Sequence, residues 1–153
     1  MEIRYLTVAE VIDTHDRTVE VSGGGLHGIL HPGRLESVLE LMQNDDYYPT
    51  FADKLAHLFF TLATGHCFLD GNKRIAITAT VHMLLVNGYM AVVARFMSDM
   101  ENVTVQVARE IISRELLCEI ITCHLNLDPD NEETKLKILS AIQAAPPEQD
   151  PQG

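Results

Sequence analysis

Residues 66–74 read HCFLDGNKR and join two apolar segments, Phe51–Thr64 and Lys73–Asn87, for which the sequence predicts helices. Apolar residues recur around most of the second segment, so its helix is expected to be central and buried. The nine joining residues combine an imidazole, a carboxylate, an amide, a glycine and two cations. Because a loop anchored between core helices is held rigidly, we predict that this stretch is the functional site and that the fold is built around it.

The start of the second predicted helix has the features of an anion site. Asp70–Asn72 form its cap region, where backbone N–H groups are unpaired and the helix dipole is positive. Lys73 and Arg74 follow in the first turn, where a positive side chain opposes the dipole at a cost of roughly 0.3–1 kcal/mol each. Gly71 lets the backbone approach a ligand closely, as glycines do in loops that bind phosphate. The pattern predicts that a phosphate group binds here, in contact with Gly71, Asn72, Lys73 and Arg74.

Two further residues of the stretch suit phosphate-transfer chemistry. Asp70 is a suitable Mg²⁺ ligand, since Mg²⁺ usually takes one or two carboxylates together with phosphate oxygens. His66 supplies an imidazole, the side chain most often used as a general base, and suits proton removal from a hydroxyl. Each residue alone has an ordinary interpretation as a turn, cap or solvated surface residue, and their joint arrangement favours a site. Cys67, Phe68 and Leu69 are predicted to be apolar supports of the loop.

Composition bounds the class of protein. The 153 residues are 46% apolar and 22% charged, which indicates one ordinary globular domain. A net charge of −11 argues against a direct nucleic-acid binder, which needs clustered Lys and Arg. Cys67, Cys118 and Cys123 lack metal-site or disulfide spacing, and no secretory or membrane-spanning segment is evident. We expect a soluble, cytoplasmic protein without membrane contact.

The remaining chain predicts mainly helices. Helices are expected to begin at Thr7, which has a capping-box pattern with Glu10 and whose helix closes by Arg17, and near Pro32, Ser98 and Ser113. Ile3–Leu6 and Met90–Ala94 are strand candidates that could pair as a small β patch. His15-Asp16 could be a second titrating pair, although core capping or a surface contact is the favoured interpretation. The predicted fold class is therefore all-α: a compact helical bundle with a small β patch or flap.

The chain is predicted to divide at residue 127. Residues 128–153 are expected to form an acidic C-terminal helix, Glu132–Ala144, followed by a tail that should be disordered. Residues 1–127 form the predicted functional domain. Within it, three consecutive glycines after Ser22 predict a loop or irregular hairpin.

The run His66-x-Phe68-x-Asp70-Gly71-Asn72-Lys73-Arg74 resembles the signature of the Fic/Doc family. Its lysine after the asparagine is similar to the Doc (death-on-curing) branch, because typical Fic sequences carry glycine there. A second arginine, usual in Fic sequences a few residues after the first, is absent from the run that follows Arg74. The segments Tyr48–Lys54, Leu85–Tyr89 and Gly23–Pro32 also look like Doc sequences, and the likeness covers about Ile3 to Leu125.

The resemblance implies a function as well as a fold. Doc-like proteins are toxins that transfer the γ-phosphoryl group of ATP to a Ser or Thr hydroxyl of a protein, with Mg²⁺ as cofactor and translation elongation factor Tu as the expected target. A small antitoxin encoded beside the toxin usually holds it. The resemblance also implies that a flap, about Val19–His31 here, lies over the site and aligns the target segment by main-chain pairing.

Two rival functions stay open at this point. The first is the activity typical of the wider Fic family, transfer of AMP from ATP to a target hydroxyl; Lys73 argues against it, because a bulky cation should crowd or reposition the phosphates. The second is a non-catalytic nucleotide- or partner-binding module, which would have no need of His66 as a base. The inhibitory run that silences many Fic proteins, Ser or Thr followed after three residues by Glu and Gly or Asn, does not occur in the sequence.

Overall fold

The computed structural model describes residues 2–147, and residues 1 and 148–153 lie outside the described part of the chain. The described residues contain seven α-helices and the segments that connect them. The helices are α1 Val8–Val21, α2 Pro32–Leu41, α3 Phe51–Thr64, α4 Asn72–Val86, α5 Met90–Ala108, α6 Arg114–Leu125 and α7 Glu132–Ala144. Among the described residues no strand forms, so the all-α prediction is confirmed. None of these helices is both long and apolar enough to cross a lipid bilayer.

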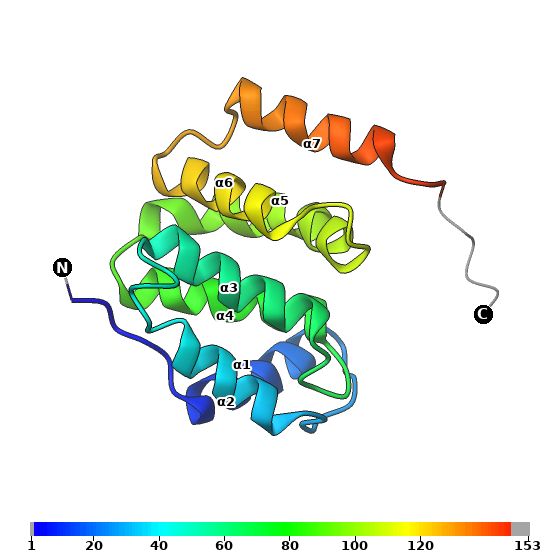
Figure 1. The fold of residues 1–153 in the computed structure, drawn as a ribbon. Helices are drawn as coiled ribbons and strands as arrows, with labels where there is room; N and C mark the ends of the chain where they lie inside the picture. Colours follow the sequence, from blue (N-terminus) through cyan, green and yellow to red (C-terminus); the bar gives the residue numbers. More distant parts are fainter. Residues whose placement is uncertain (1, 148–153) are drawn as a thin grey trace.

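Helices α3 and α4 lie at the centre of the molecule. Figure 1 shows them between a layer formed by α1 and α2 and a layer formed by α5 and α6, with α7 outside the latter. Nine of the fourteen residues of α3 are buried, which explains why its apolar residues occur on more than one face. Thr50 caps α3 through a reciprocal pair of hydrogen bonds with Asp53, and Thr7 caps α1 in the same way with Glu10. The predicted central position of α4 and the predicted capping box at Thr7 are thus confirmed.

Both predicted strands are wrong. Met90–Ala94 forms the first turn and more of α5, which therefore begins well before Ser98. Val92, Phe96 and Met100 are buried at helical spacing, so this apolar run faces the core as a helix. An apolar run as short as this one does not distinguish strand from helix by itself, and packing against α4 decides the outcome.

The N-terminal segment finds a partner other than a strand. The backbone N–H of Arg4 donates to the side-chain oxygen of Asn87 at 2.9 Å, and the side-chain amide of Asn87 donates to the carbonyl of Arg4 at 2.9 Å. One side chain just after α4 therefore satisfies both backbone groups that a neighbouring strand would have paired. Leu6 is buried as a result, without any regular structure.

The glycine-rich segment is shorter than predicted because α1 is longer. Helix α1 continues to Val21, and the buried Val19 belongs to it, which corrects both the predicted end near Arg17 and the flap range Val19–His31. The segment between α1 and α2, residues 22–31, is hereafter called the flap. Its contact with the rest of the chain includes one isolated antiparallel bridge, between Ile29 and Phe68.

Helix α7 has the predicted bounds and packs on α6. Ala145–Pro147 follow it without regular structure. The predicted disorder of the tail falls mostly on residues 148–153, outside the described residues. The division of the chain at residue 127 stays a prediction.

Candidate active site

The motif loop, residues 65–71, connects the two central helices. Gly65 ends α3, and a Cβ at this position would lie 2.5 Å from the carbonyl oxygen of Thr61, so a larger residue would not fit without a shift. The guanidinium of Arg34, from α2, donates to the carbonyl of Gly65. His66 follows in the left-handed region, with φ 50°, and its side chain is exposed. The loop therefore projects the imidazole away from the core immediately after a braced helix end.

Phe68 anchors the loop from below. Its ring is 1% exposed and stacks on the buried His15 of α1, with ring centroids 3.9 Å apart. Asn72 holds the Phe68 backbone on both sides: its side-chain oxygen accepts from the Phe68 N–H at 3.1 Å, and its amide donates to the Phe68 carbonyl at 3.0 Å. Phe68 is thus the predicted apolar support, whereas Leu69, predicted to be an apolar support as well, is 51% exposed. The difference arises because Leu69 lies under the flap at Gly28 instead of in the core.

Cys67 is fully buried, and burial raises the pKa of its thiol. A protonated, buried thiol is a poor nucleophile. Cys67 therefore packs, as predicted.

All six predicted site residues line one pocket of about 760 Å³, hereafter called the motif pocket. His66 and Asp70 come from the loop, and Asn72, Lys73 and Arg74 come from the first turn of α4. The opposite wall is the end of α5. The complete lining is Ala63, Thr64, His66, Leu69, Asp70, Gly71, Asn72, Lys73, Arg74, Val105, Ala108, Arg109 and Glu110.

The Asp70 carboxylate is held by backbone amides. The N–H of Gly71 donates to one carboxylate oxygen at 2.7 Å, and the N–H of Leu26, in the flap, approaches the other at 3.4 Å. The guanidinium of Arg74 lies 3.9 Å away. The hydrogen bond from Gly71 is the largest of the contributions that lower the pKa of Asp70, followed by that from Leu26. Asp70 is therefore ionised at neutral pH and able to bind a cation.

The start of α4 is open to an anion. Gly71, with φ 75°, occupies the N-cap position and has no side chain to cap the first-turn N–H groups. Lys73 is exposed and Arg74 partly exposed in that turn. Backbone donors, the positive end of the dipole and two cations thus occupy the same wall of the motif pocket, which is the arrangement that binds phosphate at helix starts.

The flap pairs with the motif loop through its backbone. The N–H groups of Leu30 and His31 both donate to the carbonyl of Cys67, at 2.8 and 3.0 Å, and the N–H of Leu69 donates to the carbonyl of Gly28 at 3.1 Å. These contacts place the flap beside the loop at the site, as the resemblance implied. The flap is therefore tied by its backbone to the three residues that follow His66.

The sequence analysis missed two residues of this pocket, Arg109 and Glu110. They lie at and just after the end of α5 and face the motif from the other side. Glu110 has φ 62°, an uncommon conformation for a non-glycine residue that it shares with His66. No spacing in the sequence relates these residues to the motif, because the helix pair α4 and α5 brings them there.

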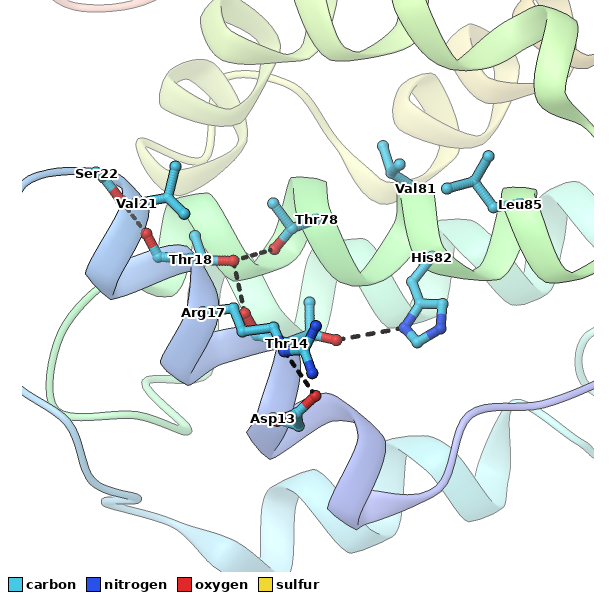
Figure 2. A pocket seen from close by; sticks show the side chains of 10 residues that line it. All are labelled: Asp13, Thr14, Arg17, Thr18, Val21, Ser22, Thr78, Val81, His82 and Leu85. Atoms are coloured by element: carbon cyan, nitrogen blue, oxygen red, sulfur yellow. Dashed lines mark hydrogen bonds and ion pairs between the residues drawn. The ribbon is translucent and has the colours of Figure 1, made fainter.

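A second pocket lies on the side of α4, against α1, and is hereafter called the apolar groove. Figure 2 shows that its walls come from these two helices. Its volume is about 470 Å³, and its lining is Asp13, Thr14, Arg17, Thr18, Val21, Ser22, Thr78, Val81, His82 and Leu85. Thr14 lies 3.3 Å from a ring nitrogen of His82, and Thr18 donates to Thr78 at 3.1 Å. These internal hydrogen bonds use the polar groups between the two helices, and none of the six predicted site residues lies in this groove.

Comparison with known proteins agrees with the geometry. A sequence model of the Fic/DOC family matches residues 5–84, a range that includes the motif loop, the flap and nearly all of α4. The chain is also similar to the protein kinase doc of Escherichia phage P1, with 33% identity over 89 residues, which is 56% of this chain and 70% of that protein. The range that the family model matches contains all six predicted site residues. This chain therefore belongs to the Fic/Doc family, in its Doc branch.

Proposed function

We propose that this protein is a Doc-like toxin that transfers the γ-phosphoryl group of ATP to a Ser or Thr hydroxyl of a protein target. The observation that carries the proposal is the motif pocket, in which an exposed imidazole, an ionised carboxylate and a cationic helix start share one cavity. The name of the phage P1 relative, a protein kinase, favours phosphoryl transfer. Lys73 favours phosphoryl transfer too, because a lysine at this position is similar to the Doc branch, whereas typical Fic sequences carry glycine there.

His66 is the proposed general base. Its side chain is exposed and lines the motif pocket, and the flap pairs with the next residue of the loop, Cys67. We propose that the flap presents the target hydroxyl to this imidazole. As the hydroxyl oxygen forms a bond to the γ-phosphorus, His66 accepts the hydroxyl proton, and the bond from the γ-phosphorus to the bridging oxygen breaks to release ADP. General base catalysis of this kind contributes typically about 10²–10⁴-fold in rate.

Asp70 is the proposed ligand of Mg²⁺. The chemistry fits, because Asp70 is ionised and Mg²⁺ needs only one or two carboxylates when phosphate oxygens complete its shell. Among the described residues no group of three or more His, Cys, Asp or Glu side chains could hold a metal without such help. When bound, the metal supplies charge neutralisation at the phosphates. Asp70 is thus expected to bind Mg²⁺ well only together with a nucleotide.

The start of α4 is the proposed phosphate cradle. The first-turn N–H groups, Lys73 and Arg74 stabilise charge on the transferred group, and Gly71 lets the backbone approach it. Asn72 is proposed to contribute by holding the loop in shape, since its side chain bonds to the Phe68 backbone on both sides. Most of the catalysis would be placement and electrostatics.

The proposal is tested by measuring which phosphate of ATP is transferred to protein. Purified protein, Mg²⁺ and a bacterial extract are incubated with ATP labelled in parallel at the α- or the γ-phosphate, with His66→Ala as control. Label transferred from the γ-position alone, and lost in the variant, is the expected result. Label from the α-position would mean AMP transfer, and label from neither position would mean a nucleotide- or partner-binding module.

AMP transfer is the second candidate, and Lys73 distinguishes it. Typical Fic sequences carry glycine where this chain has Lys73, and the side chain lines the motif pocket. If this lysine orients the nucleotide, Lys73→Gly should move the transferred label from the γ- toward the α-phosphate. An unchanged product in that variant would show that Lys73 does not orient the nucleotide.

The proposed partners follow from the toxin assignment. Translation elongation factor Tu is the proposed target and a separate small antitoxin the proposed inhibitor, both acting in the cytoplasm. The chain expressed alone should slow bacterial growth, and the His66→Ala variant should not. Equal growth with both proteins, at equal expression levels, would contradict a toxin.

A further inference from the structure

His15 lies beneath the motif loop although it belongs to α1. Its side chain is 1% exposed, and its ring stacks on Phe68 with an interplanar angle of 11°. Its Nε2 lies 2.7 Å from the carbonyl oxygen of Asp70. The sequence analysis favoured core capping or a surface contact for His15-Asp16, and the structure agrees: His15 is a core residue. Its bond goes to the backbone of the residue proposed to bind Mg²⁺.

The hydrogen bond identifies the tautomer of His15. A carbonyl oxygen only accepts, so Nε2 must carry the hydrogen and donate it. The other nitrogen, Nδ1, is buried and has no hydrogen-bond partner among the described residues. The nearest carboxylate, that of Asp16, lies 3.8 Å from Nδ1 and is closer to His27 of the flap, at 2.9 Å. His15 therefore makes one directed bond, and it makes that bond to the loop.

That bond orients the peptide unit between Asp70 and Gly71. The C=O of the unit accepts from His15, and the N–H of the same unit donates to the Asp70 carboxylate at 2.7 Å. Gly71 has φ 75°, and glycine adopts the alternative conformations of such a unit at little cost. Without the bond from His15, this peptide unit could rotate and its N–H would leave the carboxylate. The contacts of the carboxylate that remain, with Leu26 at 3.4 Å and Arg74 at 3.9 Å, are longer.

We propose that His15 is a positioning residue: its Nε2–H holds the Asp70–Gly71 peptide unit in the orientation that points the Gly71 amide at the Asp70 carboxylate. Its consequence for catalysis rests on the proposed function, because it concerns the carboxylate that would bind Mg²⁺. The claim about the loop does not depend on the proposed function. No other described side chain donates a hydrogen bond to this carbonyl.

Two variants separate the hydrogen bond from the packing. His15→Phe keeps an aromatic ring against Phe68 and removes the donor. His15→Gln places an amide N–H near the position of Nε2 and restores the donor without the ring. Val11→Ala, a change at a fully buried position one turn earlier in α1, is the control for general loss of stability.

The first measurements need no catalytic activity. In the unmodified protein, ¹⁵N chemical shifts of the His15 ring should show the hydrogen on Nε2. Amide hydrogen exchange at Gly71 should be faster in His15→Phe by roughly threefold to tenfold, the equivalent of one neutral hydrogen bond. It should return toward the original rate in His15→Gln, and Val11→Ala should not change it beyond its effect on global stability. A hydrogen on Nδ1, or Gly71 exchange that is the same in His15→Phe, would overturn the proposal.

The last measurement connects the loop to the proposed chemistry. The Mg²⁺ concentration that gives half-maximal transfer from ATP should rise roughly threefold to tenfold in His15→Phe and recover in His15→Gln. An unchanged Mg²⁺ requirement in His15→Phe would overturn the consequence for catalysis. If the unmodified protein transfers no label at all, the proposed function fails, while the ring tautomer and the Gly71 exchange still decide the role of His15.

Discussion

Helix α4 contributes to two pockets of opposite character, and the difference between them locates the chemistry. Its first turn supplies Asn72, Lys73 and Arg74 to the motif pocket, and its side supplies Val81, His82 and other residues to the apolar groove. Each pocket contains an imidazole and an arginine, so these residue types alone do not distinguish them. The motif pocket differs in having an uncapped helix start and an ionised carboxylate held by backbone amides.

The two pockets show that the role of a histidine or an arginine depends on its conformation and its neighbours. His66 is exposed in a left-handed loop conformation beside unpaired backbone donors, whereas His82 lies in the middle of a helix and contacts the hydroxyl of Thr14. Arg109 has no carboxylate partner within hydrogen-bond or ion-pair distance among the described residues, whereas Arg17 pairs with Asp13 one turn earlier in α1 at 3.1 Å. Matched substitutions in the two pockets therefore test the assignment, as follows.

The imidazole pair should show the largest effect. His66→Ala is expected to lower the transfer rate by about 10²–10⁴-fold, because it removes the proposed general base. His82→Ala, in the apolar groove, should leave the rate within about twofold, the size of a surface effect. The measurement is single-turnover transfer from labelled ATP, with thermal unfolding recorded for both variants. A comparable loss of rate in both variants at unchanged stability would remove the distinction between the pockets.

Variants of the two pockets can be compared only at pH values at which the protein is folded. His57, on α3, is buried beside Arg114 of α6, and burial together with the Arg114 charge lowers its pKa to about 4. Below pH 6.5, His57 is protonated in the unfolded chain, but in the folded chain it stays neutral down to about pH 4. The free energy of unfolding therefore falls as the pH is lowered from 6.5 to 4. The free energy of unfolding should drop by roughly 2 kcal/mol between pH 7 and pH 5 from this group.

Urea unfolding at the two pH values measures this drop, and His57→Phe should make it smaller. The replacement keeps an aromatic ring against Tyr48, on which His57 stacks at 4.3 Å. Some pH dependence should remain, because burial also lowers the pKa of His124. An identical drop with and without His57 would mean that its titration does not contribute.

Arg109 and Arg17 form the second matched pair, one in each pocket. Arg109 tests the wall of the motif pocket that α5 supplies, which lies outside residues 66–74. Arg109→Ala is expected to raise the KM for ATP roughly tenfold, the equivalent of one charge-assisted hydrogen bond of about 1.5 kcal/mol. Arg17→Ala should leave the KM unchanged, because its charge is already used by Asp13 at the other pocket. Steady-state kinetics with varied ATP distinguishes the two. An unchanged KM in Arg109→Ala would confine nucleotide binding to the motif itself.

The leucine pair should show the smallest effect. Leu69, 51% exposed, lies under the flap at Gly28, and Leu85, 44% exposed, lines the apolar groove. Leu69→Ala should loosen the flap and raise the KM for the protein target by about twofold to threefold, while Leu85→Ala should change it by less than the error. Both variants should lose no more than about 0.5 kcal/mol of stability, as expected for partly exposed positions. A larger change of this KM in Leu85→Ala than in Leu69→Ala would indicate that the apolar groove is coupled to the motif pocket.

Much of the architecture and the core of the site could be predicted from the sequence. Local signals predict the bounds of α3 and α7, the capping box at Thr7 and the position of α4. Such signals are read correctly because caps and helical hydrogen bonds join residues a few positions apart. The six proposed site residues are found for a similar reason: one short loop and one helix turn carry them all, so they are close in space whatever the rest of the chain does.

Only the tertiary structure decided the features that depend on distant residues. Met90–Ala94 is helical because α5 packs on α4, His15 supports the loop because α1 crosses beneath it, and Arg109 enters the pocket because α5 ends there. Each of these outcomes depends on which helix faces which, and that choice is set by burial of the whole core, not by any local pattern. The sequence by itself therefore determined the chemical groups of the site, and the packing of α1 and α5 decided which other residues surround them.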